Sequence, residues 1–230
     1  MNVAIVVAAG KGTRLGGDRP KQFLELGGVP IIIHTLRQFE RSKQIDEVIA
    51  VLPADETAGF ESLARKFELT KLRGAIAGGA SRAQSVRNGL NAIADAEIVA
   101  VHDGVRPFVT PAEIDSVVAA ARENGAAILT AAVADTIKRL EGERIAETVP
   151  RASLRRALTP QAFRFEILKQ AYEQLDELES AGIDVTDESL LVERLGIEIL
   201  SVQGSPRNIK ITNEADLALA NSLLLLTTDY

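Results

Sequence analysis

The stretch AAGKGTRLGGDRPK, residues 8–21, follows the apolar run VAIVV at residues 3–7. Together they predict a buried strand that leads straight into a long glycine-rich loop. Of the twelve residues from Gly10 to Lys21, four are glycine and four are basic, and Asp18 is the only acid. The loop carries a local charge of +3 in a chain of net charge −6, so a bound anion is the first interpretation to consider.

Glycine and basic residues in one loop suit a polyphosphate ligand. Glycine lets backbone N–H groups approach a ligand closely, and lysine and arginine supply charge-assisted donors to phosphate oxygens. The dinucleotide fingerprint GxGxxG is absent because Leu15 stands where its third glycine belongs, and the Walker Gly-Lys-Ser/Thr triplet is absent too. What remains is GxGxR, with Lys21 seven residues beyond Arg14. The alternative interpretation is a flexible surface turn with solvated charges.

Composition limits the classes of function open to the chain. The 230 residues include no cysteine and only two histidines, which excludes disulfides, thiol nucleophiles and a three-histidine metal site. A pI near 5.1 with few aromatic residues argues against a general nucleic-acid or acidic-membrane surface, so we expect neither partner. No stretch approaches the roughly 18 apolar residues of a membrane span, and the N-terminal apolar run is too short for a secretory signal. We therefore expect a cytoplasmic protein.

Apolar runs alternate with amphipathic segments, which is the pattern of βαβ units around a mostly parallel sheet. Ser81 as an N-cap, and Thr110 with Glu113 as a capping box, mark two helix starts clearly. His34 falls inside an expected helix, where we interpret it as a packed or half-exposed residue. The expected strands are residues 3–7, 46–53, 72–77, 97–103, 126–134 and 197–204, and the expected helices are residues 30–39, 54–67, 81–93, 110–124, 162–180, 187–195 and 213–226.

Residues 135–152 differ in character from the rest of the chain. The segment DTIKRLEGERIAETV alternates around Glu141-Gly142, which predicts a β-hairpin, and it has too few large apolar side chains for the main core. We interpret it as an arm that projects from a single domain spanning residues 1–230. A polar hairpin is only marginally stable alone, so we expect the arm to pack against a partner.

Three expected strands end in loops of unusual composition, namely AAGKGTR after residue 7, GGASR after residue 77 and DGVRP after residue 102. Ligands of parallel α/β sheets bind beyond the carboxyl ends of the strands, so these loops should meet along one edge of the sheet. GGASR also opens a helix, whose free N–H groups favour negative or polar ligand atoms, although a purely structural Gly-Gly turn is the alternative.

The third loop carries two charged candidates with open roles. Asp103 can face a bound magnesium ion, accept from a substrate hydroxyl, or serve as a turn or cap residue. Arg106 can bind a phosphate or simply pair with an acid. His102 and Asp103 are neighbours on a strand, so their side chains point to opposite faces and a nucleophilic triad is a poor fit.

Taken together, AAGKGTRLGGDRPKQF, GGASRAQSV, HDGVRPF, ADTIKR, RASLRRALTPQ, TDE and NIKIT resemble the 2-C-methyl-D-erythritol 4-phosphate cytidylyltransferases of the non-mevalonate isoprenoid pathway. The motifs stand in the family's order and reach to about residue 220. GxGxR alone is shared by many nucleotidyltransferases, whereas the set with DGVRP, TPQ and NIKIT is far more specific. The resemblance implies an α/β, Rossmann-like nucleotidyltransferase fold with a mostly parallel twisted sheet, a homodimer, and magnesium dependence with the ion mainly bound to phosphate.

The resemblance also implies a reaction and a site. CTP and the methylerythritol phosphate would give 4-diphosphocytidyl-2-C-methyl-D-erythritol and pyrophosphate, with Arg14, Lys21, Arg151 and Lys210 as the catalytic residues. The CTP side would comprise Ala8, Ala9, Gly10, Lys11, Gly12, Gly78, Gly79, Ala80, Ser81, Ser85 and Asp103. The polyol-phosphate side would comprise Asp103, Gly104, Arg106, Thr136, Arg151, Thr159, Thr186 and Lys210, with Thr136 and Arg151 reaching a neighbouring subunit's site from the arm.

Three other functions stay open at this point. The acceptor could be another polyol phosphate such as ribitol 5-phosphate, or the enzyme could join UTP or dTTP to a sugar 1-phosphate. A non-catalytic nucleotide sensor is the alternative from another class. Direct protein ligands of the metal are not predicted, and whether Asp103 contacts magnesium or only the polyol is open as well.

Overall fold

The computed structural model describes residues 1–10 and 20–226. Strand β1 (Asn2–Val7) lies inside the sheet and all six of its residues are buried. It pairs in parallel with β4 (Glu47–Leu52) on one side and with β6 (Ile98–Asp103) on the other. These strands contain the apolar runs 3–7, 48–52 and 98–101, which are typical of parallel strands that are covered on both faces.

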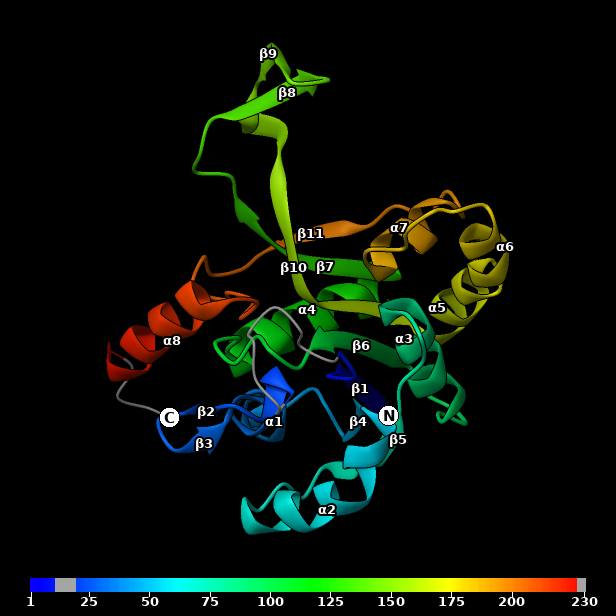
Figure 1. The fold of residues 1–230 in the computed structure, drawn as a ribbon. Helices are drawn as coiled ribbons and strands as arrows, with labels where there is room; N and C mark the ends of the chain where they lie inside the picture. The colour runs from blue at the N-terminus through cyan, green and yellow to red at the C-terminus, as the bar shows by residue number, and fades with distance from the viewer. Residues whose placement is uncertain (11–19, 227–230) are drawn as a thin grey trace.

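The main sheet has seven strands in the order β11-β7-β10-β6-β1-β4-β5 (Figure 1). The two edge strands are β5 (Leu72–Ala77) and β11 (Leu200–Gln203), and β10 (Arg155–Arg164) lies between β6 and β7 (Ala126–Ala132). Strand β10 is antiparallel to both of its neighbours, whereas the other pairings are parallel. The expected mostly parallel α/β sheet is confirmed.

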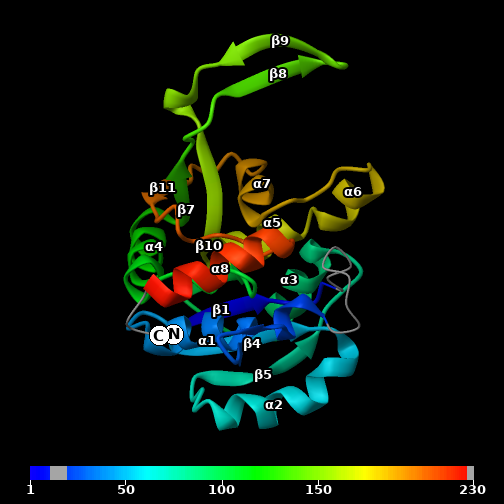
Figure 2. The same ribbon diagram turned by 60° about the vertical axis from the view of Figure 1, so that its left-hand side comes forward.

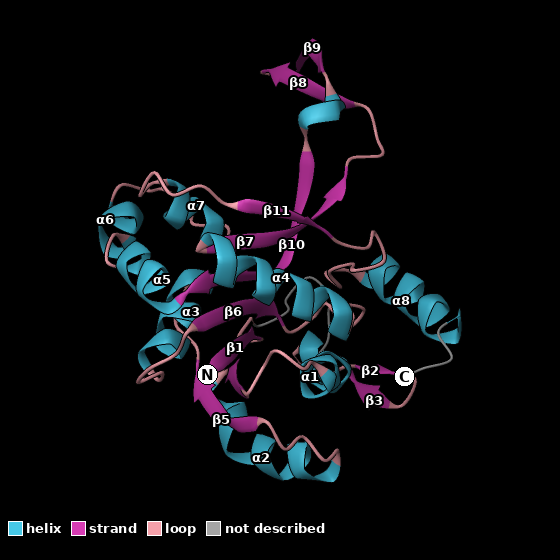
Figure 3. Cartoon of the chain, turned by 180° about the vertical axis from the view of Figure 1, so that it is seen from behind, coloured by secondary structure: helices cyan, strands magenta, loops and turns pink. Residues whose placement is uncertain are grey.

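Helices cover both faces of this sheet (Figure 3). On β1, Ala4 and Val6 face one apolar layer, while Val3, Ile5 and Val7 face the other, as the alternation of a strand requires. The first layer contains α1 (Ile31–Arg41), α2 (Thr57–Lys66) and α4 (Pro111–Asn124). The second contains α3 (Arg82–Asn91), α5 (Phe165–Tyr172), α6 (Leu175–Ser180) and α7 (Glu188–Glu193).

A third apolar cluster lies beside the sheet. Helix α8 (Glu214–Leu226) packs there against the small hairpin of β2 (Glu25–Leu26) and β3 (Val29–Pro30). Short 3-10 turns occupy Lys21–Phe23, Ala54–Glu56 and Arg151–Ser153. Within the described residues, no helix combines the length and the apolar character needed to cross a membrane.

The helix caps expected from the sequence are present. The Ser81 side chain accepts a hydrogen bond from the N–H of Gln84 and caps α3. Thr110 and Glu113 form both halves of a capping box at the start of α4, and Gly125 ends that helix with φ +90°. His34 is buried in α1 with its Nε2 within 2.7 Å of the carbonyl oxygen of Leu26, so its interpretation as a packed helix residue is confirmed.

The segment expected as an arm forms a separate two-stranded sheet, β8 (Ile137–Glu141) and β9 (Arg144–Val149). Gly142 adopts φ +61° in the tight turn, so the predicted hairpin is confirmed. Figure 2 shows the hairpin standing away from the main sheet, connected through the extended end of β10. Nearly all of its residues are exposed.

The prediction of one long helix at residues 162–180 is wrong. Residues 162–164 continue strand β10, the helix begins at Phe165, and it breaks near Glu173 before α6 begins. Strand β10 fills the position between β6 and β7, and this pairing with distant segments overrides the helical spacing of the local sequence. Pro30 was expected in the first helical turn, but it ends β3 and is the N-cap of α1.

Candidate active site

The three unusual loops begin side by side because the strand ladder continues into them. Ala8 directly follows β1, the N–H of Gly78 donates to the carbonyl of Leu52 at 2.8 Å, and the N–H of Gly104 donates to that of Val7 at 2.8 Å. Strands β1, β5 and β6 therefore deliver their loops to the same edge of the sheet. The convergence predicted from the sequence is present.

Two of these loops touch at Gly78. A Cβ atom at Gly78 would lie 2.2 Å from the Cβ of Ala9 and 2.8 Å from the Oγ of Ser85. These distances are too short for any side chain, so glycine is required for the close approach of the two loops.

The described parts of these loops line a cleft of about 600 Å³. Ten of the predicted site residues line it: Ala8, Ala9, Gly10, Lys21, Gly79, Ala80, Ser81, Ser85, Asp103 and Lys210. Val7, Gln22, Arg82 and Val105 also line the cleft and were not predicted. Lys11, Gly12 and Arg14 fall outside the described residues.

The residues on either side of the glycine-rich loop are held together. The Nε2 of Gln22 donates to the carbonyl oxygen of Ala8 at 2.6 Å, and both residues are buried. Lys21, which begins the next 3-10 turn, is thereby brought to the same cleft as Ala8 although twelve residues lie between them in the sequence.

The loop before α3 is fixed by its own helix. The N–H of Gly79 donates to the Oγ of Ser85 at 3.0 Å, and the N–H of Ala80 donates to the Oε1 of Gln84 at 3.1 Å. The Oγ of Ser81 donates to Glu179 at 2.7 Å, which ties the loop to α6. The loop is therefore shaped before any ligand binds.

Asp103 is the buried centre of charge in the site, with a side chain only 7% exposed. Its Oδ1 accepts from the Nε of Arg82 at 3.1 Å, and its Oδ2 accepts from the Nε of Arg106 at 3.1 Å and the Nζ of Lys210 at 3.0 Å. Burial alone would raise the pKa of this carboxyl, but Arg82, Lys210 and Arg106 together hold it well below its usual range. Asp103 is therefore ionised and held in place by three cations.

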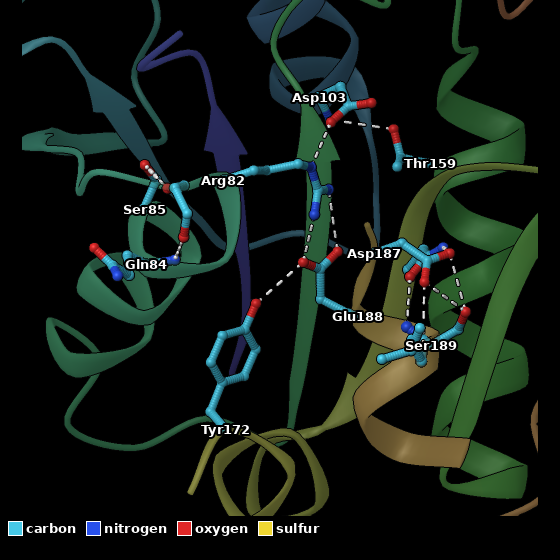
Figure 4. Close-up of polar contacts among 12 residues, drawn as sticks. Arg82, Gln84, Ser85, Asp103, Thr159, Tyr172, Asp187, Glu188 and Ser189 are labelled. Carbon is cyan, nitrogen blue, oxygen red and sulfur yellow. Dashed lines mark hydrogen bonds and ion pairs between the residues drawn. The ribbon is translucent and has the colours of Figure 1, made fainter. Parts of the chain in front are cut away.

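Glu188 extends this network to α7, as Figure 4 shows. Arg82 donates to both Glu188 oxygens, at 2.7 and 3.1 Å, and the hydroxyl of Tyr172 donates to Oε1 at 3.1 Å. Burial would lower the pKa of Arg82, but the two carboxylates raise it above its usual value. Neither Arg82 nor Glu188 was predicted as a site residue. An arginine at the first position of α3 could have signalled an acidic partner, because a cation is unfavourable at a helix N-terminus.

Thr159 lies directly behind Asp103. Its Oγ1 accepts from the N–H of Asp103 at 3.1 Å and lies 3.0 Å from the Nδ1 of His102. Burial lowers the pKa of His102 to about 3, so the ring is neutral at physiological pH. The hydroxyl of Thr159 therefore donates to Nδ1, which leaves Nε2–H to donate to the carbonyl oxygen of Arg106 at 3.2 Å. His102 joins two predicted site residues without entering the cleft.

Several predicted residues do not line the cleft of their own chain. Arg106 is largely buried and bonded to Asp103 and to the carbonyl oxygen of Asn208. Of the two roles that the sequence suggested for Arg106, the structure therefore shows the pairing with an acid. Gly104 is buried beneath Ala8. Thr186 is exposed just before the N-cap of α7.

Thr136 and Arg151 lie at the base of the arm, and both are exposed. Arg151 donates from Nη1 to the carbonyl oxygen of Ala134, which connects the two chain segments that enter and leave the hairpin. Neither residue lines the cleft of its own chain.

Across residues 1–10 and 20–226, no group of three or more histidine, aspartate or glutamate side chains is positioned to hold a metal ion. Both oxygens of Asp103 accept from cationic side chains.

A cleft at the carboxyl edge of a mostly parallel sheet, lined by residues 8–10 that follow the first strand and by two lysines, suits a nucleotide whose phosphates need positive charge. The fold and the cleft place the chain among the Rossmann-like nucleotidyltransferases. The sequence model of 2-C-methyl-D-erythritol 4-phosphate cytidylyltransferase matches residues 2–225, and the chain belongs to that family.

Individual relatives agree with this assignment. The 2-C-methyl-D-erythritol 4-phosphate cytidylyltransferase of Geobacillus kaustophilus is 42% identical over 221 residues, covering 96% of each chain. That of Bacillus velezensis is 44% identical over 223 residues, covering 96% of this chain and 95% of the relative. Among solved structures, the 4-diphosphocytidyl-2C-methyl-D-erythritol synthase of Anaerococcus prevotii superposes with a TM-score of 0.85 at 31% identity, covering 97% of this chain and 96% of that one.

Replacing Gly78 by alanine should lower the free energy of unfolding by about 1–3 kcal/mol, because the new Cβ overlaps Ala9 and Ser85. Urea denaturation measures the change. Gly59→Ala is the matched control, because Gly59 lies in α2 with no atom within 4 Å of the added Cβ. Gly59→Ala should raise the free energy of unfolding by about 0.5–1 kcal/mol. Equal stability of Gly78→Ala and the native chain would contradict the close approach.

The stability of the fold should fall in acid because of its histidines. Between about pH 6.5 and pH 3 the unfolded chain binds a proton at His102 that the folded chain does not, so the free energy of unfolding falls by up to about 1.4 kcal/mol per pH unit. His34, whose pKa burial also lowers, acts in the same direction. Urea denaturation at pH 7, 6 and 5 measures the slope.

His102→Asn should reduce that slope by about 1 kcal/mol per pH unit between pH 6 and 5 while keeping the contribution of His34. The slope is compared rather than the stability itself, since the variant also loses the contact of the His102 ring with Phe39 at every pH. His34→Gln is the reciprocal control. A slope that His102→Asn leaves unchanged would show that the His102 ring titrates normally in the folded protein.

Proposed function

We propose that this chain transfers the cytidylyl group of CTP to 2-C-methyl-D-erythritol 4-phosphate, giving 4-diphosphocytidyl-2-C-methyl-D-erythritol and pyrophosphate for isoprenoid precursor synthesis. Membership of the cytidylyltransferase family supports this reaction. The observation that carries it is the placing of Lys21 and Lys210 in one cleft with the glycine-rich loops. The alternative acceptor, ribitol 5-phosphate, is not favoured by the family assignment.

The reaction needs positioning and positive charge more than a protein nucleophile. A phosphate oxygen of the acceptor attacks the α-phosphorus of CTP, and the bond from that phosphorus to the bridging oxygen breaks as pyrophosphate leaves. Two anions must approach one another, and negative charge accumulates on the phosphoryl oxygens. The acceptor is a phosphate monoester with a second pKa of about 6, so it is mostly ionised at neutral pH and needs little help from a base.

The residues divide into two halves of one site. For the nucleotide half we propose Ala8, Ala9, Gly10, Lys11, Gly12, Gly78, Gly79, Ala80, Ser81, Ser85 and Asp103, with Arg14 and Lys21 on the triphosphate. For the acceptor half we propose Asp103, Gly104, Arg106, Thr159 and Thr186, with Lys210 near the reacting phosphate. The contacts of Asp103 support its place between the halves, because it holds Lys210 at the cleft and Arg106 behind it.

We propose a magnesium ion held mainly by the phosphate oxygens of CTP and by water, with no protein ligand assigned. The occupation of both Asp103 oxygens by cationic side chains supports this arrangement, and magnesium commonly binds through substrate phosphates. When bound, the ion would neutralise part of the triphosphate charge. We also propose a cytoplasmic location, where CTP is available.

A homodimer through the arm completes the proposal. The hairpin exposes Leu140 and Ile145, which are 58% and 65% accessible, and a second copy of the chain would cover them. In that dimer, Thr136 and Arg151 would reach the acceptor half of the neighbouring subunit's site. Their position at the arm, outside the cleft of their own chain, supports this role.

The activity can be tested by measuring pyrophosphate release from the purified chain with CTP, magnesium and the methylerythritol phosphate. We expect turnover with this acceptor, much slower turnover with ribitol 5-phosphate or with UTP or dTTP and sugar 1-phosphates, and none in excess EDTA.

Arg14→Ala and Lys21→Ala should each lower kcat roughly a hundredfold to a thousandfold, about 3–4 kcal/mol of transition-state stabilisation. Lys66→Ala, at an exposed position in α2, is the control. Near-normal turnover of both loop variants would refute the catalytic role of the loop.

The role of the arm can be tested in trans. Arg151→Ala should impair use of the polyol phosphate while the dissociation constant for CTP stays unchanged, and Arg139→Ala, which breaks only an exposed ion pair on the arm, is the control. Mixing Arg151→Ala with Lys210→Ala after dissociation should restore about a quarter of wild-type activity, because random pairing gives one intact site in each mixed dimer. Mixed dimers without recovered activity would show that Arg151 does not complete a neighbour's site.

A further inference from the structure

Arg82 connects two carboxylates that come from distant parts of the chain. Its Nε donates to the Oδ1 of Asp103 at 3.1 Å, and its two terminal nitrogens donate to Glu188 at 2.7 and 3.1 Å (Figure 4). The Arg82 side chain is 23% exposed, while those of Asp103 and Glu188 are 7% and 0% exposed. The planar guanidinium is the side-chain group that can span both acids in this way.

These contacts join three structural elements at the site. Arg82 is the first residue of α3, directly after the GGAS loop on the nucleotide side. Asp103 ends β6, and Glu188 is the first residue of α7, two residues beyond Thr186 on the acceptor side. One guanidinium therefore fixes the start of both helices relative to the end of the strand.

Glu188 is completely buried and binds the guanidinium of Arg82. Its side chain has no exposed surface, and its oxygens accept from Arg82 and from the hydroxyl of Tyr172. It is thus an anchor that holds the guanidinium in place. A buried carboxylate that lost Arg82 would be left largely uncompensated, so a single substitution of Arg82 would also destabilise the fold.

The contact between Arg82 and Asp103 affects the position of Lys210 in the cleft. Arg82 occupies Oδ1, so Oδ2 faces Arg106 and Lys210. Without Arg82, Oδ1 would lose its hydrogen bond while Oδ2 kept Arg106, so the carboxylate could turn and both oxygens could attract Lys210 away from a bound phosphate. The orientation of Asp103, and through it the position of Lys210, thus depends on Arg82.

We propose that Arg82 is a positioning residue for the cytidylyl transfer: it orients Asp103 and thereby sets the placement of Lys210 in the acceptor half of the site. Resting on the proposed function, this inference adds a role to a residue outside the predicted catalytic set. Wild-type turnover with CTP and the polyol phosphate is measured first, so a failure of the proposed reaction is recognised before any variant is compared.

The test uses variants that separate positioning from folding. Arg82→Gln combined with Glu188→Gln removes both charges and leaves no unpaired Glu188 carboxylate, so its thermal midpoint should stay close to that of the wild type. Its kcat/KM for the polyol phosphate at saturating CTP should fall about a hundredfold, as expected for misplacement of a reacting group. Its dissociation constant for CTP, measured by calorimetry without acceptor, should rise less than tenfold, because Asp103 is only one of the residues proposed for the nucleotide half.

Two further variants sharpen the comparison. Arg82→Lys keeps the charge beside Glu188 and should retain stability, but one ammonium group cannot span both carboxylates, so kcat/KM for the acceptor should stay low. Arg87→Gln is the matched control, because Arg87 lies on the same helix and pairs with the exposed Asp176. Arg87→Gln should leave both the dissociation constant for CTP and kcat/KM for the polyol phosphate unchanged.

Two results would overturn the proposal. The first is a double variant whose acceptor kcat/KM stays within threefold of the wild type. The second is a CTP dissociation constant that rises as much as acceptor kcat/KM falls, since a general structural role would disturb both halves of the site equally.

Discussion

A carboxylate with almost no access to water must be surrounded by positive charge, and Asp103 meets that condition through three separate segments of the chain. Arg82 comes from the start of α3, Arg106 from the loop after β6, and Lys210 from the segment before α8. Arg82 and Lys210 line the cleft from two different segments, and Arg106 lies behind it. The ion pairs at the two carboxylate oxygens of Asp103 therefore hold a helix, a strand end and a distant loop in place around the site.

The elements that agree with their local sequence could be predicted from it. The apolar strands β1, β4 and β6, the Ser81 cap, the Thr110 capping box and the Gly142 hairpin each follow from the residues that form them. Strand β10 could not, because it contains Pro160, and proline in a central strand usually argues against a strand. The structure accommodates it where the register between β10 and β7 shifts, between Ala157 and Gln161. That irregularity depends on partners distant in the sequence.

In the candidate site too, residues with a local sequence signal could be predicted, whereas residues paired with distant partners could not. Lys21, Asp103 and the Gly78 loop could be predicted because each lies at a strand end or in a recognisable motif. The pairing of Arg82 with Glu188 could not be read from the sequence, since 106 residues separate them and nothing local relates them. What the sequence did offer was an arginine at the first position of α3 and a glutamate at the first position of α7, the second favourable to the helix dipole and the first unfavourable. An unfavourable charge of this kind is a useful signal that a distant partner exists.

Strand β10 begins at the base of the arm and runs through Thr159 to Arg164, with one shift of its register to β7 between Ala157 and Gln161. Residues 155–157 pair with β7 in one register and residues 161–163 in another, so one residue inserted or deleted between Arg155 and Thr159 would change how the base of the arm is placed relative to the threonine hydroxyl. The hairpin beyond Arg155 has no such restriction, because its turn faces solvent. The arm can therefore accept a change of length at its tip, whereas a change in the number of residues from Arg155 to Thr159 would alter its connection to the contacts of Thr159 with His102 and Asp103.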